Sequence, residues 1–80
     1  MCMQKKILLD STDKIVQFVK LSQEADCEVD VVAGNRLCVD AKSIMGVMSC
    51  LNKEPVTLDI HGKQEEIDAY LDSVRVYCIS

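Results

Sequence analysis

The stretch around which this chain is organised is Ala41-Lys42-Ser43-Ile44-Met45-Gly46-Val47-Met48-Ser49-Cys50. It follows an alternating, strand-like run, and it predicts a short amphipathic helix with Ser43 as its N-cap. Because so short a helix buries only one face, some of its apolar side chains are expected at the surface. Ile44, Met45 and Met48 then form a candidate patch, since exposed flexible methionines are typical of protein-binding surfaces. The alternative, from spacing alone, is a capping serine followed by core methionines.

The rest of the chain shows helical and strand periodicities that are separated by polar breaks. The expected elements are a strand over 3–9, a helix over 14–25, a hairpin with strands over 28–33 and 36–40, the Ser43 helix, a strand over 56–60 and a helix over 63–76. Either Asp10 or Ser11 is expected to cap the first long helix, and Gly34-Asn35 to turn the hairpin. Residues 75–79 alternate as well, so the sequence leaves their structure open.

The apolar positions of these elements predict one shared core. Its members are Ile15, Phe18, Val19, Ser22, Val29, Val31, Cys38, Val56, Leu58, Ile60, Ile67, Tyr70, Leu71 and Val74. The element order β-α-β-β-α-β-α indicates a single α+β domain over residues 1–80. Its expected architecture is an open-faced β-sandwich, with a four-stranded antiparallel sheet and helices on one face.

Charge and cysteine usage exclude several classes of function. The formal net charge of −4 argues against binding to nucleic acid or to an anionic membrane surface. No apolar run is long enough to span a bilayer, and no secretory signal is visible, so we expect a soluble cytoplasmic protein. The five cysteines are odd in number and widely spaced, which favours reduced thiols. With one histidine and no Cys-x-x-Cys pair, neither a zinc site nor a cofactor is expected.

His61 is the only side chain with a proton switch near neutral pH. It lies in the His61-Gly62 turn, with no nucleophilic serine or cysteine near it in sequence. A lone histidine cannot form a catalytic triad, so a solvated turn histidine is the simpler interpretation. We therefore expect no enzymatic activity.

The segment from Lys42 to Ser49 resembles the regulatory-serine segment of HPr, the phosphocarrier of the bacterial sugar phosphotransferase system. The order of elements that the periodicity predicts is also the one this family uses. The resemblance implies that Ser43 is the target of the ATP-dependent HPr kinase/phosphorylase. It further implies that Lys42, Ile44, Met45 and Met48 contact protein partners.

The histidine that carries the phosphoryl group in HPr has no counterpart in this sequence. The resemblance places Ser11 or Thr12 at the position of that histidine, and Asp13 where the family has an arginine that helps to hold phosphate and to dock partners. A serine phosphate ester is too stable to pass its phosphoryl group onward, whereas a histidine phosphoramidate does so readily. The sequence is similar in this respect to the histidine-less catabolite-repression HPr.

The resemblance thus implies a regulatory protein of carbon catabolite control, whose partners are a LacI-type repressor or components of the phosphotransferase system. One alternative is a phosphocarrier that accepts phosphate from enzyme I at a noncanonical residue. Another is a degenerate scaffold that binds a different protein. The expected state is a monomer or a weak homodimer, in which an exposed strand edge would provide the contact.

Overall fold

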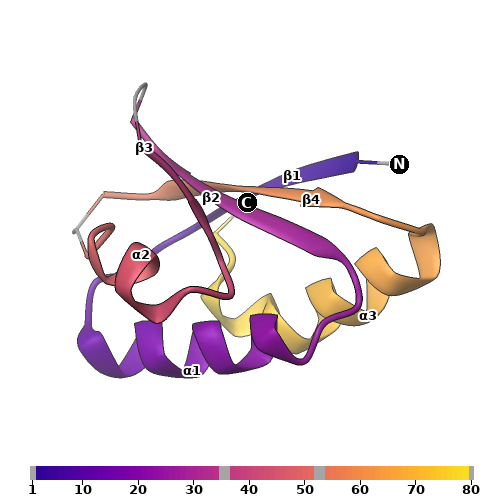
Figure 1. The fold of residues 1–80 in the computed structure, drawn as a ribbon, viewed down its shortest axis with the longest axis horizontal. Helices are drawn as coiled ribbons and strands as arrows, with labels where there is room; N and C mark the ends of the chain where they lie inside the picture. Colours follow the sequence, from indigo (N-terminus) through magenta and orange to yellow (C-terminus); the bar gives the residue numbers. More distant parts are fainter. Residues whose placement is uncertain (1, 35–36, 52–53, 80) are drawn as a thin grey trace.

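Antiparallel strands form one sheet in the order β1-β4-β2-β3 in the computed structural model, which describes residues 2–34, 37–51 and 54–79. The strands are β1 (Cys2–Ile7), β2 (Glu28–Ala33), β3 (Leu37–Asp40) and β4 (Val56–His61). The helices are α1 (Thr12–Gln23), α2 (Ile44–Met48) and α3 (Gln64–Val74), and all lie on the same side of the sheet (Figure 1). The predicted open-faced α+β sandwich and its element order are confirmed.

The interior strand β4 shows that one face of the sheet is buried and the other is open. It pairs with β1 along one edge and with β2 along the other. Successive side chains of a strand point to opposite faces, so those of β4 alternate between the helices and solvent. Val56, Leu58 and Ile60 are buried against the helices, as predicted. Val29 and Val31 of β2 join them in the same core.

The first long helix begins two residues earlier than predicted because Ser11 is its N-cap. The Ser11 hydroxyl accepts a hydrogen bond from the Lys14 amide at 3.3 Å, which settles the choice between Asp10 and Ser11. The helix ends at Gln23. Its predicted inward stripe is confirmed, with these residues fully buried: Ile15, Phe18, Val19 and Ser22.

The end of the chain folds back along β1. After α3 a 3₁₀ turn covers Arg75–Tyr77, so the predicted helix over 63–76 is shorter than expected. Cys78 then forms an isolated antiparallel bridge with Ile7, and the Ile79 amide donates to the Lys6 carbonyl at 2.9 Å. Ile67, Tyr70 and Val74 of α3 are buried as predicted, whereas Leu71 is half-buried.

The hairpin of β2 and β3 forms in the predicted place, but one residue points the other way. Gly34 has a φ of 64°, as a tight turn requires, while Asn35 and Arg36 lie outside the described residues. Val39 pairs with the buried Val31 and shares its face, so Cys38 faces away from the helices and is exposed. The prediction of Cys38 as a core residue was wrong, because the register and not the apolar character fixes its face.

Two hydroxyls meet inside this core and link α1 to α3. Ser22 Oγ donates to the Phe18 carbonyl at 2.9 Å and lies 2.7 Å from the Tyr70 hydroxyl. Since the Ser22 proton is already used, the Tyr70 hydroxyl is the donor of the second bond. Burial raises the pKa of Tyr70 and keeps this hydroxyl protonated.

Ser22→Ala is expected to destabilise the fold more than Tyr70→Phe does. The first change leaves a buried phenol without a partner and costs about 1–3 kcal/mol, whereas the second leaves Ser22 bonded to Phe18 and costs about 1 kcal/mol. Urea unfolding at pH 7 measures both free energies. Equal losses in the two single variants, or strict additivity in the double variant, would contradict the pairing.

Candidate functional site

Ser43 caps α2 and remains at the surface. Its hydroxyl accepts a hydrogen bond from the Gly46 amide at 3.3 Å, and its carbonyl accepts one from the Val47 amide at 2.9 Å. Ser43 has an extended backbone, with φ −99° and ψ 111°, as an N-cap should. The predicted capping role is confirmed, and Ser43 as a residue is exposed.

Gly46 allows α2 to lie close to β3. A Cβ at this position would come within 3.2 Å of Val39 Cβ and within 3.3 Å of Ser43 Oγ. Glycine is otherwise unfavourable inside a helix, so its place here is explained by this close approach. The contact fixes which side of α2 faces the core, and Val47 on that side is fully buried.

The opposite side of α2 leaves large apolar side chains in solvent. Met45 is 83% exposed, Ile44 40% and Leu51 46%, while Met48 is half-buried and packs against the core. We call Ile44, Met45, Met48 and Leu51 the α2 patch. Leu51 was not predicted, because it follows the last turn of a helix too short to show a clear periodicity. The prediction of surface methionines thus holds for Met45, and the alternative of core methionines holds in part for Met48, which packs against the core.

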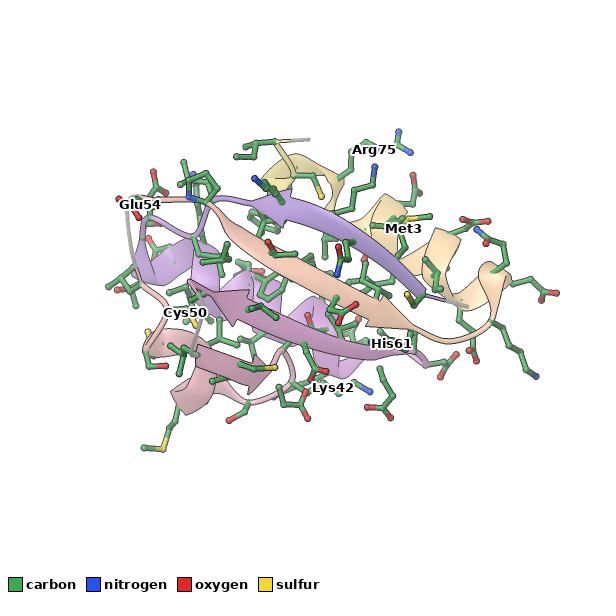
Figure 2. All side chains as sticks on the ribbon, turned by 90° about the horizontal axis from the view of Figure 1, so that it is seen from above. Met3, Lys42, Cys50, Glu54, His61 and Arg75 are labelled. Carbon is green, nitrogen blue, oxygen red and sulfur yellow. The ribbon has the colours of Figure 1, made fainter. Side chains whose placement is uncertain are left out.

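Lys42 lies next to Ser43, yet its ammonium is directed at the segment that follows α1. Its Nζ donates to the Ala25 carbonyl at 3.2 Å, and its carbonyl accepts from Gln23 Nε2 at 3.0 Å. Its amide donates to Asp40 Oδ1 at 2.9 Å. Lys42 therefore holds the loop before α2 against the end of α1 (Figure 2).

The start of α1 carries acidic groups and hydroxyls, not an imidazole. Asp10 forms an ion pair with Lys14 at 2.9 Å, and this hydrogen bond holds the pKa of Asp10 below its ordinary value. Thr12 and Asp13 are exposed, while Ser11 is half-buried as the cap. Thr12 is thus an exposed residue with Asp10 and Asp13 on either side of it in sequence.

His61 lies at the far end of the sheet from this helix start. Val56 of β4 pairs with Ile7, whose strand leads into α1, whereas His61 pairs with Cys2. Val56 and His61 are five residues apart along β4, which corresponds to about 17 Å in an extended strand. The only histidine of the sequence is therefore not part of the α1 start.

Three residues able to hold a metal ion together lie on the open face of the sheet. Within the part of the chain that the structure describes, one such group occurs, formed by Cys2, Asp59 and His61 on the open face of the sheet. In the same part of the chain, no helix combines the length and the apolar character that crossing a membrane requires.

Comparison with known proteins identifies one family and one fold. A family profile described as the PTS HPr component phosphorylation site matches residues 14–75. The crystal structure of a phosphocarrier protein HPr from Bacillus anthracis str. Ames is similar, with a TM-score of 0.67 at 21% sequence identity, over 90% of this chain and 95% of that one. A search of curated protein sequences found no match.

Removal of the Ser43 hydroxyl is expected to weaken α2. Ser43→Ala leaves the Gly46 amide without its acceptor and lowers the free energy of unfolding by about 0.5–2 kcal/mol. Ser43→Asn, which retains a capping acceptor, is the control and is expected to stay close to the unsubstituted protein. Chemical denaturation measures both variants, and an equal loss in the two would show that the hydroxyl does not act as a cap.

Proposed function

The chain belongs to the PTS HPr family, and from this premise we propose that it is a non-enzymatic regulatory protein with Ser43 as its phosphosite. In this proposal the α2 patch is the surface that its partners contact. The kinase is an HPr kinase/phosphorylase that uses ATP. The partner that binds the phosphorylated form is a LacI-type repressor or a component of the phosphotransferase system. The observation that carries the proposal is an exposed capping hydroxyl beside exposed apolar side chains.

The two capping serines of this chain differ in their suitability for phosphate. Ser11 is followed in the first turn of its helix by Asp13, and Asp10 precedes it. Ser43 has no acidic residue in the first turn of α2. A phosphate at Ser11 would meet carboxylates of its own sign, whereas one at Ser43 would meet main-chain amides. This contrast favours Ser43 over Ser11.

Phosphorylation at Ser43 would change the chemistry of the patch without removing its apolar side chains. The phosphate adds a charge of about −1.5 to −2 at neutral pH directly before Ile44 and Met45. A partner that offers both a cationic group and an apolar pocket would then bind more tightly. A partner that offers only an apolar surface would bind more weakly, so the modification selects among partners.

The same geometry argues against a phosphoryl relay. At the start of α1 the hydroxyls of Ser11 and Thr12 would give stable esters, and Asp10 and Asp13 would repel an incoming phosphate. His61 could form the labile phosphoramidate, but it lies at the other end of the sheet. We therefore place the regulatory role ahead of carrier activity at a noncanonical residue.

Incubation with an HPr kinase and ATP is expected to add a single phosphate to the protein. Ser43→Asn retains the helix cap but has no hydroxyl, so its intact mass should not change. Ser11→Ala, which lacks the other capping hydroxyl, should still gain one phosphate. Intact-mass spectrometry decides between the two sites, and a gain that persists in Ser43→Asn would refute the phosphosite.

Truncation of the most exposed methionine should weaken partner binding without affecting the fold. Met45→Ala is expected to reduce the affinity of the phosphorylated protein for a LacI-type repressor by about tenfold, with a stability change below about 0.5 kcal/mol. Val76→Ala is the matched control, because Val76 is also 83% exposed but lies in the 3₁₀ turn after α3. Calorimetric titration measures both, and equal affinities would exclude the α2 patch.

A further inference from the structure

The open face of the sheet brings together three side chains of different chemistry. Cys2 of β1 is the direct cross-strand partner of His61 of β4, and Asp59 precedes His61 by two residues on the same face. One ligand atom from each of Cys2, Asp59 and His61 lies within 4.8 Å of the other two. Figure 2 looks onto this face, with His61 at the end of β4. All three lie on the face of the sheet opposite the core.

One atom of this group has no hydrogen-bond partner among the residues that the structure describes. Asp59 Oδ1 is buried and receives no hydrogen bond from the described residues, although the side chain as a whole remains 28% exposed. His61 Nε2 lies 3.3 Å away as an ion-pair contact. A buried carboxylate oxygen without a hydrogen bond is costly, and a cation bound between it and the imidazole of His61 would compensate that cost.

We propose that Cys2, Asp59 and His61 form a binding site for a borderline-soft divalent cation, of which Zn²⁺ is the representative. A thiolate, an imidazole and a carboxylate are the ligand types that Zn²⁺ accepts together, whereas Mg²⁺ and Ca²⁺ require oxygen. Ligands at 2.0–2.2 Å from a tetrahedral ion lie about 3.4 Å apart, which is close to the observed separation of Asp59 Oδ1 and His61 Nε2.

The site would have three protein ligands and a fourth position that faces solvent. Cys2 is exposed, so its thiol can rotate toward the ion without disturbing the core. The ion would link the start of β1 to the end of β4. This end of the two strands is opposite the end at which Ile7 bridges to Cys78. This inference concerns the face opposite the helices, so it stands or fails separately from phosphorylation at Ser43.

Metal titration of the full, reduced and metal-free chain tests the site. Zn²⁺ in competition with a chromophoric chelator is expected to bind one ion per chain, and Co²⁺ to give a thiolate-to-metal charge-transfer band. Cys2→Ser should abolish that band, and Cys2→Ser and His61→Gln should each weaken binding by about tenfold or more. Zn²⁺ should also raise the thermal midpoint of the unsubstituted chain but not that of Cys2→Ser.

Cys38→Ser is the matched control, because Cys38 is also an exposed strand cysteine but lies on β3, two strands away from β4. It should retain the band, the stoichiometry and the thermal shift. Absence of binding, or a band that survives in Cys2→Ser, would overturn the proposal. Loss of the band in Cys38→Ser would also overturn it, because the metal would then bind at another thiol. Asp59 and His61 would in that case form only an ion pair. Thermal unfolding without metal verifies that each variant is folded.

Discussion

The pairing of β4 with β1 and β2 is the constraint on which the rest of the structure depends. Because both edges of β4 are bonded, neither its register nor its facing can change without disrupting the whole sheet. One set of its side chains forms the floor of the core under α1 and α3. The other set, which includes Asp59 and His61, must therefore face the open side, where Cys2 of β1 is the neighbour.

The helix side of the sheet holds the surface that we associate with regulation. α2 is only five residues long, so it depends on its cap and on packing more than on helix propensity. Gly46 brings it close to β3, Ser43 closes its first turn, and Val47 anchors it in the core. Because these constraints turn Val47 toward the core, the side chain of Met45 points into solvent. An exposed methionine is thus a consequence of how α2 is held.

The two faces of the domain carry different chemistry, and the sheet separates them. A hydroxyl and apolar side chains lie at α2, whereas a thiol, a carboxylate and an imidazole meet on the open face. The HPr family to which the chain belongs supplies a context for the first. The second rests on the ligand geometry of this chain alone, and a phosphate at one face would not be within contact of an ion at the other.

The sequence by itself determined the elements, their order and most of the core, because the periods of 2 and 3.6 report burial within one element. It also determined the Ser43 cap, since capping is a contact between near neighbours in the chain. Only the tertiary structure decided the features that depend on register. These are the outward face of Cys38, the return of residues 75–79 to β1, the exposure of Leu51, and the meeting of Cys2 with Asp59 and His61. No local spacing in the sequence indicates that Cys2 lies beside Asp59 and His61, because antiparallel pairing joins residues that are far apart in the chain.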